Sequence, residues 1–191
     1  MTNSVMLWTT AAVLLFWAVG AYNRLVRLRA EANAAFATVD AELARQVELV
    51  HTHLPSADGV QPPPVDAEDT GFWASLHAAA AQLGATLAAA QKRPLDPERI
   101  AALSAAADVL RMAWERAERD DAHDLAGPRM PDTLLQQRAQ ALLQAHAATE
   151  AFNITVAKYN EGIAQFPALL LAWLFGFHPA RALAPVIAAL P

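Results

Sequence analysis

The first 23 residues carry no charged side chain, and this stretch constrains the chain more than any other feature. From Val5 to Tyr22 the sequence reads VMLWTTAAVLLFWAVGAY, which at about 1.5 Å per residue crosses most of a hydrocarbon core about 30 Å thick. Trp8 lies near one end and Trp17 with Tyr22 near the other, and amphipathic rings of this kind settle at the depth of lipid headgroups. We therefore predict a transmembrane anchor over residues 1–23.

Three arginines, Arg24, Arg27 and Arg29, follow the apolar stretch directly. Because basic residues are retained on the cytoplasmic side, we expect a single-pass protein of the inner membrane, with its N-terminus outside and its remaining residues in the cytoplasm. A cleaved signal peptide is one alternative, although the first four residues lack the basic region that such a peptide has. A buried core helix is the other, and two tryptophans with no charge over so long a run favour lipid instead.

The composition favours helices for the rest of the chain. Hydrophobic residues make up 55% and charged residues 17%, and alanine and leucine, which favour helix over strand, dominate. The net charge of -5 and the lack of a clustered basic face predict no nucleic-acid partner. The sequence has no cysteine, which excludes disulfides, thiolate metal sites and cysteine nucleophiles.

Apolar residues spaced three and four apart predict about four helices packed as an elongated antiparallel bundle. The first bundle helix covers residues 24–54 and continues the anchor as one long rod, since no proline or glycine interrupts it between Ala21 and Leu54. A proline-rich loop follows over 55–69. The remaining bundle helices occupy 70–166, at about 71–92, from the Asp96-Pro97-Glu98 start to about 123, and from Asp132 or Thr133 onwards.

The C-terminal segment 167–191 is apolar, and it begins within a stretch, FPALLLAWLFGF, that is too short to span a membrane. The last long helix runs antiparallel to the first, so this segment returns towards the bilayer. It then lies in the membrane interface with Trp173, Phe175 and Phe177 as wedges, docks a partner, or folds back to cap its own bundle. The sequence leaves these interpretations open.

Two blocks of the sequence resemble the LemA family, which pairs an N-terminal membrane helix with a helical bundle. The first block is Tyr22 to Arg29 with Ala35-Phe36, Val39-Asp40, Leu43 and Arg45, and the second is Phe152-Asn153, Val156, Tyr159-Asn160, Ile163, Phe166-Pro167, Leu169, Phe175-Gly176-Phe177 and Pro179. The middle departs from the family pattern at residues 48–54 and in the proline-rich loop, and the ending 181–191 also differs. The resemblance implies a divergent LemA-like bundle whose biochemical role is undefined.

Several polar residues lie beside the apolar stripes and are candidates for structural pairing: Tyr22, Asn23, Asp40, Arg45, Asn153, Tyr159 and Asn160. Asn153 and Asn160 are seven residues apart and therefore share one helical face. We expect them to bond Asp40, Tyr22 or Asn23 across a helix interface, since buried polar groups are costly unless paired. They would then fix the helix register, as a buried asparagine does in coiled coils, and a binding site is the alternative.

No set of residues forms a recognisable active site. His51 and His53 near Glu48 are the only arrangement reminiscent of a metal site, yet on a helix they point about 200° apart. The sequence contains neither a Gly-x-Ser-x-Gly motif nor a glycine-rich phosphate loop. We therefore predict no enzyme activity, no metal and no cofactor.

A non-catalytic scaffold or adaptor at the cytoplasmic face is the favoured function, with the lipid bilayer as one partner and a protein partner that the sequence does not name. An accessory subunit or modulator of a membrane-bound protease or ATPase is the alternative. Homo-oligomerisation stays open.

Overall fold

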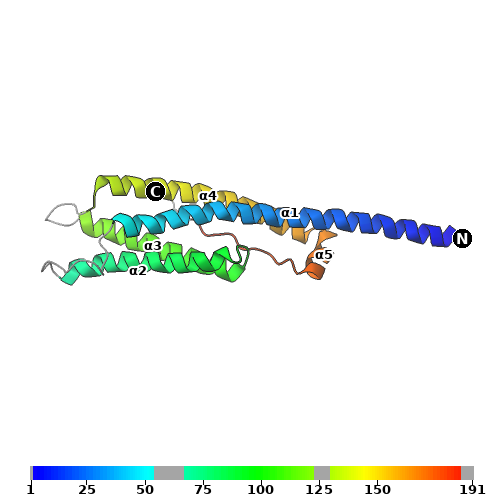
Figure 1. Ribbon diagram of the computed structural model, residues 1–191, viewed down its shortest axis with the longest axis horizontal. Helices are drawn as coiled ribbons and strands as arrows, with labels where there is room; N and C mark the ends of the chain where they lie inside the picture. Colours follow the sequence, from blue (N-terminus) through cyan, green and yellow to red (C-terminus); the bar gives the residue numbers. More distant parts are fainter. Residues whose placement is uncertain (1, 54–66, 123–129, 186–191) are drawn as a thin grey trace.

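A computed structural model describes residues 2–53, 67–122 and 130–185. Within these residues the chain is all-α, without a strand. Its helices are α1 (Thr2–His53), α2 (Ala67–Gln91), α3 (Pro97–Ala122), α4 (Asp132–Ala164) and α5 (Ala168–Phe175). Helices α1 to α4 run in alternating directions along an elongated bundle, and the N-terminal part of α1 projects beyond it (Figure 1).

The predicted continuous rod is confirmed, because α1 is a single helix of 52 residues. Its N-terminal part contains an 18-residue window of mean hydropathy 1.7, and none of this window is buried. From Leu25 onwards the character changes, because one face becomes buried through Ala32, Phe36, Val39 and Leu43. The same helix is thus apolar and largely exposed from Val5 to Tyr22 and amphipathic in its second half. By length and composition the first half is a candidate membrane span, and a signal sequence has the same character.

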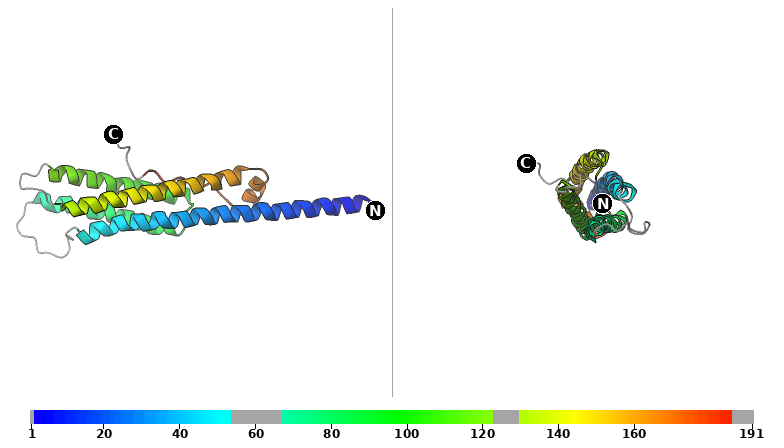
Figure 2. Two further views of the ribbon diagram at one scale, coloured as in Figure 1. Left: turned by 90° about the horizontal axis from the view of Figure 1, so that it is seen from above. Right: turned by 90° about the vertical axis from the view of Figure 1, so that its left-hand side faces the viewer.

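Helices α1 and α4 lie side by side along the bundle, as the view from above in Figure 2 shows. Phe36 and Phe152 meet edge to face at the middle of this interface, with 5.6 Å between their ring centroids. Near the end of α4, a Cβ on Gly162 would lie 2.6 Å from Leu28 Cδ1, so any larger residue here would have to displace the end of the Leu28 side chain. The predicted pairing of the first and last long helices is confirmed.

Helices α2 and α3 form a hairpin whose backbone comes closest to the rest of the bundle where α2 packs on α1. The predicted start of α3 is confirmed: Asp96 Oδ1 accepts a hydrogen bond of 3.0 Å from the Glu98 amide, and Pro97 occupies the first helical position. Within the described residues no Cα atom of α3 lies within 8 Å of one of α4. The backbones of these two helices therefore lie farther apart than those of α1 and α4 or of α2 and α3, and Arg138 of α4 reaches Glu118 of α3 between them.

The four expected bundle helices are α1 to α4, and the described residues contain a fifth helix, α5, in the C-terminal segment. Gly176, in the left-handed conformation at φ 69°, ends α5, and the Phe177 amide then bonds back to the Ala172 carbonyl. Two helix boundaries differ slightly from the prediction. Helix α4 ends at Ala164, and α2 begins inside the predicted loop, at Ala67. Residues 54–66 of that loop lie outside the described residues.

Candidate functional site

Helix α5 packs its small residues inward, against the place where α1 leaves the bundle. Ala168 and Ala172 are buried. The aromatic rings around them meet α1 in three pairs, Trp17 with Phe166, Tyr22 with Phe175 and Tyr22 with Phe177, with centroids 6.0, 4.9 and 6.2 Å apart. Helix α5 thus caps this end of the bundle and lies against the last turn of the predicted anchor.

Large apolar side chains on α5 and just before it are exposed to solvent, and we call this surface the α5 face. Its large side chains, each more than half exposed, are Phe166, Leu169, Leu170, Trp173, Leu174 and Phe175, with Trp173 the most open at 84%. Both views show α5 at the end of the bundle from which the apolar half of α1 projects (Figures 1 and 2). Two exposed apolar surfaces from distant parts of the sequence therefore share one end of the molecule.

The three arginines after the predicted anchor have different environments. Arg24 donates to the Gln165 side chain at 3.3 Å and so holds the end of α4. Arg29 lies over the Phe177 ring, 5.8 Å from its centroid. Arg27 pairs with Glu31 one turn away and is largely exposed. Two of the three therefore attach the segment around α5 to α1.

After α5, residues 177–185 run back along the bundle without helical structure, and we call residues 178–185 the C-terminal strap (Figure 1). Asn160 Nδ2 donates to the Ala180 carbonyl at 2.8 Å, and Asn160 Oδ1 accepts from the Ala180 amide at 2.8 Å. Asn153 repeats the arrangement with Leu183, at 2.9 Å for both bonds. Each amide side chain therefore satisfies both backbone groups of one strap residue.

Two further side chains bond the strap backbone. The Tyr159 hydroxyl donates to the His178 carbonyl at 3.0 Å, and burial raises the pKa of this hydroxyl, while the charge of Arg29 lowers it to a smaller extent. From α3, Ser104 Oγ accepts from the Ala184 amide at 3.2 Å. The strap thus bridges α4 and α3 where these helices are far apart.

Only two strap side chains, Ala180 and Leu183, are buried, at 7% and 2% exposed. Pro179, Arg181 and Pro185 are exposed, as are the two remaining alanines. A small side chain and a leucine, three residues apart, are thus the strap residues that join the buried core.

The expected partners of the asparagines were wrong. Asn153 and Asn160 do share a face, but they bond the strap rather than Asp40, Tyr22 or Asn23. The reason is that this face of α4 points away from α1, towards the C-terminal strap.

Asp40 and Arg45 serve different interfaces of α1. Asp40 Oδ1 accepts from Gln91 of α2 at 2.8 Å, and Arg45 Nη1 donates to Gln144 of α4 at 2.8 Å. Asn23 is exposed. These polar pairs link α1 to α2 and to α4.

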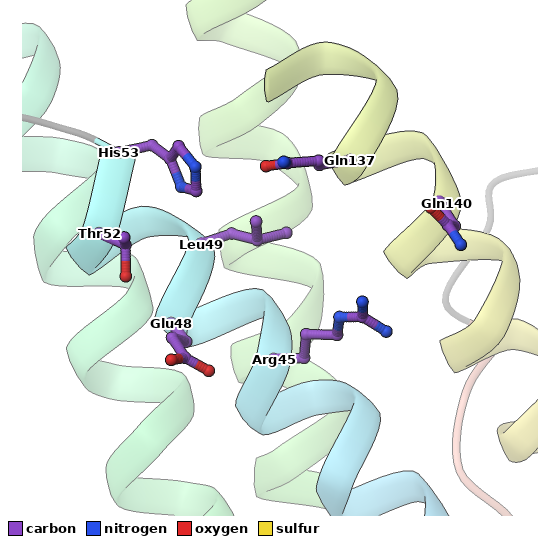
Figure 3. A pocket seen from close by; sticks show the side chains of 7 residues that line it. All are labelled: Arg45, Glu48, Leu49, Thr52, His53, Gln137 and Gln140. Carbon is purple, nitrogen blue, oxygen red and sulfur yellow. The ribbon is translucent and has the colours of Figure 1, made fainter. Parts of the chain in front are cut away.

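A cleft of about 370 Å³ opens between the end of α1 and the start of α4 (Figure 3). Its lining consists of Arg45, Glu48, Leu49, Thr52, His53, Gln137 and Gln140. His53 and Gln137 extend towards each other across it, and Leu49 lies between them in the view of Figure 3. The cleft is lined by both charged and uncharged polar side chains, with Leu49 as its one apolar residue.

The two candidate histidines diverge, as expected for a helix. His53 lines the cleft, whereas the His51 ring lies 5.6 Å from that of His77 on α2. Among the described residues no group of three or more His, Cys, Asp or Glu side chains could hold a metal ion.

The sequence did not lead us to expect that the two asparagines bond the C-terminal strap. The signal was present in two features taken together: an amide pair on one face of α4, and a segment bounded by Pro179 and Pro185 that cannot form a helix. An extended segment with unpaired backbone groups needs partners, and paired asparagines can supply them.

Comparisons with protein-family models, with curated proteins and with solved structures find no match. The resemblance to the LemA family therefore stays a prediction from the two sequence blocks.

Proposed function

We propose that this chain is a LemA-like, membrane-tethered and non-catalytic scaffold or adaptor, with the first half of α1 in the bilayer and the bundle at its cytoplasmic face. The observation that carries the proposal is the pair of exposed apolar surfaces, the first half of α1 and the α5 face, at one end of the bundle. Contiguous apolar surface of this extent is unusual on a protein that is surrounded by water alone.

The contacts between α5 and α1 suggest the depth at which α5 lies. Tyr22 packs on Phe175, and Arg24, the first charged residue of the chain, bonds Gln165 just before α5. Helix α5 therefore sits at the boundary between the uncharged and the charged part of α1. A bilayer that covers the first half of α1 would meet the α5 face at its headgroup layer, where aromatic side chains are stable.

The scaffold part of the proposal rests on the shape of the molecule. A continuous α1 connects the anchor to the bundle, and α2 and α3 run along the part of the bundle away from the projecting half of α1 (Figure 1). The cleft lies between the end of α1 and the start of α4. These surfaces are held at a fixed distance from the membrane, which suits a protein that presents binding surfaces to partners.

Site-specific labelling tests the membrane contact of α5. Since the chain has no cysteine, Trp173→Cys introduces a unique thiol on the α5 face, and Glu150→Cys places a matched thiol on the exposed side of α4. Each full-length variant carries a polarity-sensitive dye in vesicles of phosphatidylcholine and phosphatidylglycerol. We expect brominated lipid to quench the dye at position 173 and to leave the dye at position 150 unchanged. Equal quenching at both positions would contradict the proposal.

The same Glu150→Cys variant tests orientation in cells. A membrane-impermeant maleimide should label it only after the inner membrane is permeabilised, because the bundle is expected in the cytoplasm. The intact mass of the extracted protein should include residues 1–21. A chain that has lost these residues would show that they form a cleaved signal peptide and not an anchor.

A further inference from the structure

The spacing of the two asparagines matches the spacing of the strap residues that they bond. Seven residues of α-helix from Asn153 to Asn160 advance by about 10.5 Å. Three residues of extended backbone, from Ala180 to Leu183, advance by about 10 Å. The strap runs antiparallel to α4, so successive amide side chains reach every third strap residue in register.

Recognition at this site is directed at the peptide backbone. Asn160, Asn153, Tyr159 and Ser104 together make six hydrogen bonds with the strap, and each one ends on a backbone amide or carbonyl. An extended segment needs partners for its backbone groups, and here side chains of α4 and α3 supply them without bonding any strap side chain. The groove between α3 and α4 therefore has the chemistry of a receptor for extended peptide, comparable to strand addition but with side chains in place of a sheet edge.

We infer that this groove is a binding site for an extended peptide segment of a partner protein, and that the C-terminal strap is its intramolecular occupant. The inference deepens the scaffold proposal and rests on it, because it names the surface that a partner uses. The partner segment displaces the strap by making the same backbone bonds to Asn153 and Asn160.

The buried strap residues define the ligand. It has a small residue at the position of Ala180 and a leucine-sized apolar residue three positions later, in place of Leu183, because these side chains enter the bundle. The positions between them face solvent and tolerate any residue. Prolines are accepted at the positions of Pro179 and Pro185, since the bonds that hold the strap use the His178 carbonyl and the Ala184 amide beside them.

Competition from the strap sets the expected affinity. A tethered segment has a high effective concentration, on the order of millimolar for a short connection, so a free peptide binds the intact protein weakly. Leu183→Asp places a charge at a position that is 2% exposed and should release the strap. Release leaves Asn153, Asn160 and Ser104 open to a peptide in trans.

The test uses the full-length protein in detergent micelles and a fluorescent peptide with the sequence of residues 178–185, HPARALAP. We expect the Leu183→Asp protein to bind this peptide at least about tenfold more tightly than the wild type does, measured by fluorescence anisotropy. Adding Asn153→Ala should reduce the affinity by about tenfold or more, because two backbone bonds are lost.

Peptide variants supply matched controls. Replacing the peptide's leucine by aspartate should abolish binding, whereas replacing its exposed arginine by alanine should leave the affinity unchanged. A Leu183→Asp protein with native helical content that binds no more peptide than the wild type would overturn the inference. If this variant does not fold, Ala180→Glu places a charge at the other buried strap position and should also release the strap. The same peptide-binding measurement on that protein then tests the inference.

Exchange of the strap between copies of the chain is a separate outcome. The Ser104 Oγ and Ala184 amide are 3.2 Å apart, so a Ser104→Cys/Ala184→Cys chain should form an internal disulfide. Mixed chains that each carry one of these cysteines should stay unlinked. A disulfide between them would overturn the inference in favour of self-association.

Peptide binding in micelles does not depend on lipid contact at α5, so a failure of the peptide test can be told apart from a failure of the membrane proposal.

Discussion

Thr149 is a fully buried polar residue whose hydroxyl has no hydrogen-bond partner among the described residues. Burying a hydroxyl without a partner costs free energy, so Thr149→Val should raise the free energy of unfolding by about 1 kcal/mol. Thr155→Val is the matched control, because Thr155 Oγ1 does donate to the Phe152 carbonyl, at 2.7 Å. Thermal unfolding followed by circular dichroism measures both, and equal shifts would show that the Thr149 hydroxyl is satisfied.

Tyr159 gives the strap a dependence on pH. Its pKa is raised by burial, so the folded protein keeps the hydroxyl proton at a pH where the unfolded chain loses it, and stability falls as the pH rises above about 10. The chain has one other tyrosine, Tyr22, so Tyr22→Phe leaves Tyr159 as the only phenol. We expect the tyrosinate absorbance of that variant to titrate above about 10.

A Tyr159→Phe protein should lose less stability than the wild type when the pH rises above about 10. At neutral pH it should already be less stable by about 1 kcal/mol, because the bond to the His178 carbonyl is gone. If Tyr159→Phe loses as much stability at alkaline pH as the wild type does, other titrating groups cause the loss.

At the scale of helices, two glycines test how closely α4 and α2 approach α1. A Cβ on Gly84 would lie 3.9 Å from Val47 Cγ1, an ordinary contact, so Gly84→Ala should stabilise α2 by up to about 1 kcal/mol through helix propensity alone. Gly162→Ala offers the same propensity but places Cβ at 2.6 Å from Leu28 Cδ1, so its net gain should be smaller. In a Leu28→Ala background the two glycine substitutions should give equal gains in urea unfolding. If Gly162→Ala still gains less stability than Gly84→Ala in that background, the contact with Leu28 is not the cause.

The helices themselves could be predicted from the sequence because their information is local. Apolar residues at spacings of three and four, the Asp96-Pro97 start and the uninterrupted run into α1 each depend on neighbouring residues alone. Helix α5 and the strap could not be predicted in this way. Leu169 to Phe175 are apolar on every side, so their pattern does not show which face is buried.

The partners of Asn153 and Asn160 depend on tertiary structure. The residues that they bond follow 20 to 30 positions later in the chain, and the pairing exists only because the strap folds back along α4. Periodicity identified the shared face of the two amides but carried no information about what lies opposite.

At the scale of the whole molecule, Arg138 joins the α2–α3 hairpin to α4 at the end opposite to α5. Its guanidinium pairs with Glu118 and lies 5.1 Å from the centroid of Trp114, both on α3. Arg138→Ala should lower the free energy of unfolding by about 2 kcal/mol and speed amide hydrogen exchange in α3 and in the start of α4.

Arg111 is the control for Arg138, because its ion pairs with Asp108 and Glu115 stay within α3. Arg111→Ala should cost about 0.5 kcal/mol and leave exchange in α4 unchanged. If both variants behave alike, the bridge between α3 and α4 contributes nothing beyond a local ion pair.

With its apolar half in the bilayer, as proposed, the unbroken α1 would also act as a lever. About 30 residues of this helix lie beyond the uncharged part, a length of about 45 Å, so a change of about 10° in the tilt of the apolar half would swing the distant end by about 8 Å. Helices tilt further when the surrounding bilayer thins. The end of the bundle farther from α5 would then change its position relative to the membrane as the membrane thickness changes. The packing of the bundle itself would stay the same.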